Sequence, residues 1–479
     1  MRSSFGDGNA SVFAGPTKRM AFAKSHIEIR LHNHFRSMVY NTGSPIQGEV
    51  VIKTQRDTPF DSVQILLLGM TKTRFEDVGS PHITTNTLLR LEMPVPESTY
   101  PTPRILEAGR TYKIPFNFVV PSHLTLNACE HKVEANYVRE HHLALPPTMG
   151  FWERDDLSPD MAQVEYLIKA RVLRHADVDD NIRALVAREQ IKILPTFLEQ
   201  PPLDAEHLAN FYRLSKSKTL RKNLLSHKIG SITASAKQPN AIFLYPDALG
   251  TTETVVNVKL VFEPATADAI PPQVTGISGK ILAHTFYSSG AMTNLPDRIP
   301  ELSRRFLTNR QLSYTATIPL FSDRIQSKTS WTAQLRNIER RDSGYSSSDL
   351  HDSKAQERHA SPIYHSCEVP VPIRLPSEGS ARGGGKTFIP TFASCITSRT
   401  YSLQISLTVG GANSGSTTLA LSLPLQIAAI AGVESPTAEV LPDFETAMED
   451  AEVESMLRPR TMMLPDLRYP GNNELPGYA

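Results

Sequence analysis

Residues 164–172 read VEYLIKARV, and this stretch decides the fold class. Apolar side chains occupy every second position, and three of the four positions between them are charged. A period of two is that of a β-strand with one buried and one solvent-facing side, because successive side chains of a strand point to opposite faces. The apolar row consists of Val164, Tyr166, Ile168, Ala170 and Val172.

The same alternation recurs along the chain, at 27–31, 112–120, 401–409 and 419–427. One-sided alternation is typical of antiparallel sheets that pack on a single face, and short strands between turns indicate β-sandwiches. Pro424 falls on the face opposite its apolar row, which predicts an edge strand because proline has no N–H to donate to a ladder. We therefore predict an all-β fold.

Composition divides the chain into two strand-rich parts of similar length. A serine-rich stretch at 336–366 interrupts the second part and is predicted to be a disordered insert. The remaining expected parts are a disordered N-terminus at 1–23, a first β-sandwich at 24–198, a basic linker at 199–230, a second β-sandwich at 231–432 and an acidic tail at 433–479.

Charge, cysteine content and motifs exclude several functions. A formal net charge of +1 argues against a nucleic-acid binder. Three widely separated cysteines indicate a reducing compartment, and the N-terminus lacks the apolar core of a secretory signal, so we expect a cytoplasmic protein. GxSxG, P-loop, post-strand GxGxxG and HExxH motifs are all missing, so we expect neither enzyme activity nor a cofactor.

The last residues, ELPGYA, contain the pattern [LP]-P-x-Y, which WW domains bind. Leu475, Pro476 and Tyr478 supply its defined positions. A proline-containing segment is already close to the polyproline II conformation, so docking costs little conformational entropy. The alternative is a chance match in a proline-rich chain.

A basic run at 216–228 is a candidate site for acidic cargo segments or anionic lipid. Its cationic residues are Lys216, Lys218, Arg221, Lys222 and Lys228. Such a run attracts negative charge, although a solvated linker explains the same composition.

Candidate phosphorylation sites lie in the serine-rich insert, at Ser343, Ser346 and Ser347. Arg340 and Arg341 precede Ser343, as basophilic kinases require, and residues 342–347 fit the phosphodegron pattern DSGxxS. We predict phosphorylation there, and a specific degron is the weaker of the two interpretations.

Four residues of the first half raise the question of a metal site: Cys129, His131, His141 and His142. Their spacing matches no common structural zinc motif, and a fourth ligand is not evident. We therefore interpret them as sheet and loop residues and predict no metal.

Residues 123–172, together with flanking motifs, resemble the N-terminal domain of the alpha-arrestins, the arrestin-related trafficking adaptors of fungal type. The resemblance is carried by Tyr40, Gly43, Ile46, Gly48 and Val50, by Gly109, Tyr112, Pro115, Phe116, Val120 and Pro121, by His141, Leu145, Pro146 and Pro147, and by Trp152, Asp155, Asp156, Pro159 and Tyr166. Gln238, Pro239 and residues 390–409 extend it more weakly into the second half.

This resemblance implies two arrestin-type, immunoglobulin-like sandwiches and an adaptor function. Members of the family bind plasma-membrane transporters or receptors and recruit WW-domain HECT ubiquitin ligases, so that ubiquitylated cargo is internalised. For this chain it implies ligase binding at the terminal motif, cargo tails and anionic membrane as partners, ubiquitin as a possible covalent modifier, and recruitment from the cytoplasm to the plasma membrane or endosomes. Two alternatives share the fold, namely a signalling scaffold, for example in ambient-pH sensing, and a retromer-like trafficking subunit without ligase recruitment.

Overall fold

The computed structural model describes residues 26–76, 80–174, 185–196, 212–221, 227–296, 310–325, 328–335, 363–376, 385–411 and 414–430. These residues form an almost entirely β structure in several sheets, which confirms the predicted all-β class. The predicted N-terminal segment, the Ser-rich insert up to residue 362 and the tail lie outside the described residues.

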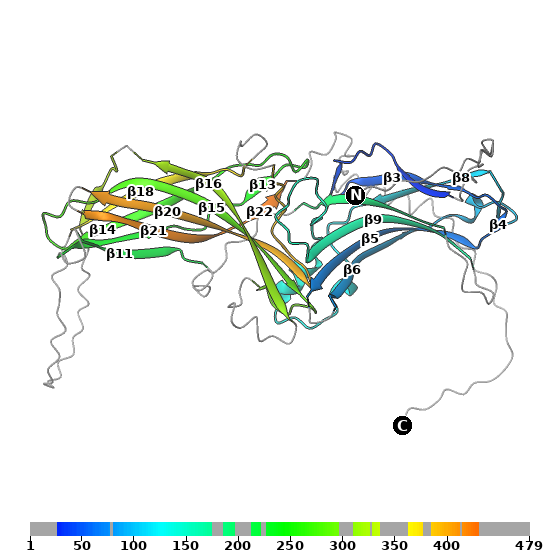
Figure 1. Cartoon of the computed structure of the whole chain (residues 1–479), viewed down its shortest axis with the longest axis horizontal. Helices are drawn as coiled ribbons and strands as arrows, with labels where there is room; N and C mark the ends of the chain where they lie inside the picture. Colours follow the sequence, from blue (N-terminus) through cyan, green and yellow to red (C-terminus); the bar gives the residue numbers. More distant parts are fainter. Residues whose placement is uncertain are drawn as a thin grey trace, which may run out of the picture. The chain divides into compact units, whose positions relative to one another are not determined.

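The first β-sandwich consists of a three-stranded and a five-stranded sheet that enclose one apolar core. Figure 1 shows β3 and β8 in one layer and β5, β6 and β9 in the other. The three-stranded sheet has the order β1 (His26–Leu31), β3 (Pro45–Lys53), β8 (Thr111–Val119). The five-stranded sheet has the order β2 (Val39–Asn41), β10 (Val186–Leu194), β9 (Ala162–Leu173), β5 (Ser62–Phe75), β6 (His82–Met93).

Strand β9 shows why this sequence builds a sandwich. Val164, Tyr166, Ile168, Ala170 and Val172 are all buried, as the alternation predicts. β9 pairs antiparallel with β5 on one side and β10 on the other, so it is central to its sheet. Its apolar face therefore lies in the core while its other face holds all three of its charged residues.

The second β-sandwich has two five-stranded sheets around a core of its own. One has the order β11 (Ser215–Arg221), β12 (Lys228–Ser235), β14 (Thr254–Pro264), β18 (Ile363–Ile373), β17 (Thr332–Leu335). The other has the order β16 (Gln311–Arg324), β15 (Gln273–Ser288), β20 (Thr397–Gly411), β19 (Phe392–Ala393), and β21 (Ser414–Leu425) also pairs with β20.

Shorter elements complete the described fold. Two-stranded sheets are formed by β13 (Ile242–Leu244) with β22 (Ile427–Ala429) and by β4 (Thr58–Pro59) with β7 (Ile105–Leu106). The helical elements are two 3-10 turns, η1 (Glu97–Thr99) and η2 (Leu126–Cys129), and one α-helix, α1 (Asn136–Leu143).

Pro424 lies in strand β21, at the edge of its sheet. β21 pairs along its length with β20, and within the described chain its other side is bridged at Ser422, by Arg213. Pro424 therefore occupies an edge strand, as predicted, where its missing N–H leaves few ladder bonds unmade.

Two predicted boundaries are wrong. Residues 215–221, expected in a linker, form β11, and β12 already begins at Lys228. In β11 only Leu220 is buried, so an edge strand of this composition has no apolar alternation to reveal it. Residues 363–366, expected in the insert, are the start of β18.

Each apolar core includes side chains from the other sandwich, at the junction between the two. Tyr287, Ile389 and Phe392 of the second half belong to the first core. Leu157 of the first half belongs to the second core, and Trp152 packs against both. The junction is therefore a packed apolar interface, and polar side chains buried within it need specific partners.

Candidate metal centre at the junction of the two sandwiches

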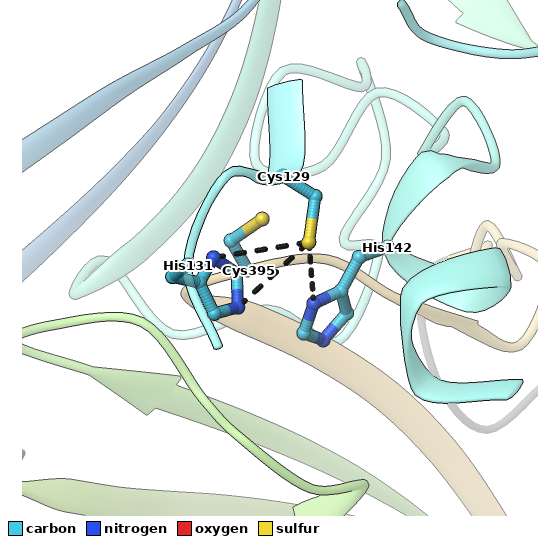
Figure 2. A group of neighbouring side chains, drawn as sticks. All are labelled: Cys129, His131, His142 and Cys395. Atoms are coloured by element: carbon cyan, nitrogen blue, oxygen red, sulfur yellow. Dashed lines mark hydrogen bonds between the residues drawn. The ribbon is translucent and has the colours of Figure 1, made fainter. Parts of the chain in front are cut away.

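Four potential metal ligands from distant parts of the chain meet at this junction (Figure 2). Cys129 ends η2, His131 follows it, and His142 lies near the end of α1. Cys395 comes from the turn between β19 and β20, 266 residues after Cys129. Their ligand atoms all lie within 4.8 Å of one another.

Cys129 Sγ is the centre of the cluster. It lies 3.6 Å from His142 Nδ1 and 3.8 and 3.9 Å from His131 Nδ1 and Nε2. His131 Nε2 also lies 3.0 Å from the carbonyl oxygen of Met292. A carbonyl oxygen only accepts, so this nitrogen donates, and Nδ1 retains the free lone pair.

Helix α1 turns His142 inward. Val138 is fully buried against Leu295 and Ala393, and His142 lies four residues later on the same helix face. His141 is rotated from His142 by about 100° around the helix axis and does not belong to the cluster. The helix ends at Leu143, shortly before Pro146 and Pro147, which cannot extend it.

Burial keeps His142 and Cys395 uncharged when no metal is bound. His142 is 1% exposed, and burial, together with the nearby His131 and His141, lowers its pKa to about 4. Burial and the neighbouring Cys129 raise the pKa of the Cys395 thiol to about 12. At neutral pH the site therefore offers a neutral imidazole, the form that ligates metals, and a thiol that must release its proton on coordination.

Hydrogen bonds also connect the chain segments around the cluster, one within the second half and others between the two halves. Met292 N donates to Cys395 O at 2.7 Å, and Glu134 N donates to Thr293 O at 3.0 Å. Cys395 Sγ in turn contacts Ala128 O at 3.5 Å. The cluster is thus formed by backbone from both sandwiches.

A buried arginine forms a second polar feature of this junction. Arg399 on β20 is 0% exposed, and its guanidinium donates to Thr285 Oγ1 at 3.0 Å, Asp156 O at 3.0 Å and Ser158 Oγ at 2.8 Å. The adjacent Asp155 instead accepts from Lys386 Nζ at 2.5 Å, so the two neighbouring aspartates have different partners. Arg399 therefore ties the 155–158 loop to the second sandwich.

The structure brings together only part of the set considered from sequence. Cys129, His131 and His142 converge, His141 does not, and Cys395 supplies the fourth donor. The interpretation of the histidines as sheet and loop residues is wrong for His141 and His142, which both lie in helix α1. Sequence reasoning missed Cys395, because a single cysteine in the stretch PTFASCITSR indicates packing as well as ligation.

The basic run divides between two faces of the edge strand. Lys216 and Lys218 lie on the face of β11 that carries the buried Leu220, and Arg221 lies on the opposite face. Lys228 begins β12. Lys222, the terminal motif at Leu475, Pro476 and Tyr478, and the candidate phosphosites Ser343, Ser346 and Ser347 lie outside the described residues.

Comparison with models of known protein families finds no match, and comparison with curated proteins finds no relative of this chain. Within the described ranges, no helix has the length and apolar character required to cross a membrane.

Proposed function

We propose that this protein is a non-enzymatic adaptor of the alpha-arrestin type. In this proposal its two sandwiches bind the cytoplasmic tails of membrane transporters or receptors. Its terminal LPGY motif recruits a WW-domain HECT ubiquitin ligase, and the cargo is then ubiquitylated and internalised. The observation that carries the proposal is this motif at the end of a chain that also folds into paired β-sandwiches.

The positions of the motif residues support the arrestin-type assignment. Gly48 of β3 lies between β1 and β8, where a Cβ atom would come within 2.4 Å of Arg30 O. Tyr166 is fully buried and donates from its hydroxyl to Pro146 O at 2.6 Å, so the LPP segment is fastened to β9. Trp152 donates from Nε1 to Thr148 O at 2.8 Å while it packs against both cores. Gly48, Tyr166 and Trp152 therefore each have a structural task in the first sandwich or at the junction.

An adaptor of this kind works by effective concentration. Pro476 and Tyr478 would fill the two pockets of a WW domain, and the sandwiches would hold the cargo. The ligase is then confined near cargo lysines, which raises the rate of ubiquitin transfer without any catalytic group in the adaptor.

The basic side chains of β11 remain candidates for acidic cargo or anionic lipid headgroups. Because the strand divides them between two faces, Lys216 and Lys218 form one small site and Arg221 contributes to another. Either site adds modest, salt-dependent attraction and would act as an auxiliary to cargo recognition by the sandwiches.

A WW-domain pulldown with the full chain tests the proposal. We expect the wild type to bind and Tyr478→Ala to lose binding, because tyrosine fills the second pocket of the groove. Tyr469→Ala is the matched control, since Tyr469 lies in the same tail but outside the LPGY pattern. Equal retention of wild type and Tyr478→Ala would refute ligase recruitment through this motif.

A further inference from the structure

We propose that Cys129, His131, His142 and Cys395 bind one structural Zn²⁺ ion, and that this ion fastens the first sandwich to the second. The inference does not depend on the proposed adaptor function. It rests on the donor set, the separations of the donor atoms, the hydrogen bond of His131 and the origin of the four ligands on two sandwiches.

The donor separations are close to those of a tetrahedral zinc site. Zinc binds sulfur at about 2.3 Å and imidazole nitrogen at about 2.0–2.1 Å, so sulfur and nitrogen ligands lie about 3.6 Å apart in a tetrahedron. Cys129 Sγ lies 3.6 Å from His142 Nδ1 and 3.8 Å from His131 Nδ1. Because all four ligand atoms lie within 4.8 Å of one another, small side-chain rotations complete the site.

His131 has the second hydrogen bond that metal-bound histidines usually have. Its Nε2–H donates to Met292 O at 3.0 Å, which fixes the ring and leaves Nδ1 for the metal. Met292 N in turn donates to Cys395 O, so the residue that orients one ligand also positions another. Two cysteines and two histidines in this arrangement select zinc among the common divalent ions.

The site is structural because protein atoms fill all four positions. Cys129, His142 and Cys395 are buried, and His131 is half-buried. A four-ligand tetrahedral site has no open position for water or substrate. Cys129, His131 and His142 come from the first sandwich and Cys395 from the second, so ligation joins segments far apart in the sequence.

Without metal, the four ligand side chains would contact one another only weakly. A thiol is a poor donor, and the sulfur–nitrogen distances of 3.6–3.9 Å are long contacts. Two metal-free alternatives give distinct experimental results, namely a set of thiol–imidazole contacts and a Cys129–Cys395 disulfide. Both predict a protein that contains no zinc.

Zinc content of the tag-free full chain is the first measurement, after expression in zinc-supplemented medium and dialysis against metal-free buffer. We expect about one zinc per chain in the wild type, and a loss of at least fivefold in Cys395→Ser and in His142→Gln. Matched controls are Cys367→Ser, a buried cysteine of β18 outside the cluster, and His141→Gln, the neighbour of His142 on α1. Both controls should retain zinc. A zinc-free wild type, or equal zinc content in Cys395→Ser and Cys367→Ser, overturns the proposal.

Cobalt substitution tests the ligand set even if a zinc-deficient variant folds poorly. The wild-type chain loaded with Co²⁺ should show the visible bands of tetrahedral cobalt and a near-ultraviolet sulfur-to-cobalt band. Absence of these bands overturns the assignment, as does a Cys129–Cys395 disulfide found by mass spectrometry in freshly purified, alkylated protein.

Hydrogen exchange tests the fastening role. Removal of zinc from the wild type by a chelator should accelerate amide exchange at least tenfold in 126–143 and 288–296. Exchange in β14 and β18, which lie in the second sandwich outside the cluster, serves as the internal reference. Unchanged exchange in all four segments after complete zinc removal overturns the fastening role.

Discussion

Replacement of Arg399 by methionine should destabilise the junction between the sandwiches. Methionine keeps most of the aliphatic volume and removes the guanidinium, which donates to Thr285 Oγ1, Asp156 O and Ser158 Oγ at 2.8–3.0 Å. The described residues include no carboxylate within ion-pair distance of Arg399, so its role is to satisfy neutral acceptors.

The expected magnitude follows from those three acceptors. The Asp156 carbonyl belongs to a buried residue and cannot rotate toward another donor, and an unpaired buried acceptor costs about 1–3 kcal/mol. The two hydroxyls can rotate, and each lost charged hydrogen bond there weakens the fold by roughly 1 kcal/mol after relaxation. The methionine variant no longer buries a charge, and the desolvation penalty that it avoids offsets part of this cost. We therefore expect a net loss of about 3 kcal/mol in the free energy of unfolding.

Urea unfolding of the full chain, followed by tryptophan fluorescence, measures this loss, because Trp152 lies at the junction. Arg399→Lys separates charge from geometry. Lysine keeps the charge but lacks the planar fork, so we expect it to be nearly as unstable as Arg399→Met. Arg374→Met is the control, since Arg374 is exposed and pairs with Glu253 on the surface, and it should change stability by under about 0.5 kcal/mol. If Arg399→Met is as stable as this control, the assigned role of the buried guanidinium is wrong.

Three further perturbations follow from individual contacts. Gly48→Ala should destabilise the first sandwich by about 3 kcal/mol because its Cβ would meet strand backbone. Gly43→Ala, at φ +81° in open space, should cost about 1 kcal/mol. Equal urea unfolding midpoints for these two variants would contradict this reasoning. Tyr166→Phe leaves the Pro146 carbonyl without its donor and should cost about 1–3 kcal/mol at pH 7. Burial raises the pKa of Tyr166 well above 10.0, so the unfolded chain loses this proton at lower pH than the folded chain does. As pH rises above 10, the wild type should therefore lose stability faster than Tyr166→Phe. Parallel profiles of stability against pH for the two proteins would contradict this. Lys218→Ile removes a charge from the exposed edge strand β11 and should promote self-association in light scattering, whereas an unchanged monomer mass would contradict a protective role.

Much of the fold was predictable from sequence because strand patterning is local. The rows at 112–120, 164–172 and 401–409 alternate strictly enough that their buried faces in β8, β9 and β20 follow directly. The pattern failed at β11, where a polar edge strand buries a single side chain, Leu220. It also failed at α1, an eight-residue helix whose N-cap, Ala135, makes no side-chain capping hydrogen bond.

The sequence alone therefore determined the all-β class, the edge position of Pro424 and the buried face of residues 164–172, since each depends on the residue pattern within one strand. Tertiary structure decided which distant groups meet. Cys395 joins Cys129 and His142, and Arg399 reaches the loop of Asp156, only because the two sandwiches pack against each other. No spacing along the chain encodes such contacts. Burial then gives them their chemistry, because the junction excludes the water that would otherwise satisfy these polar groups.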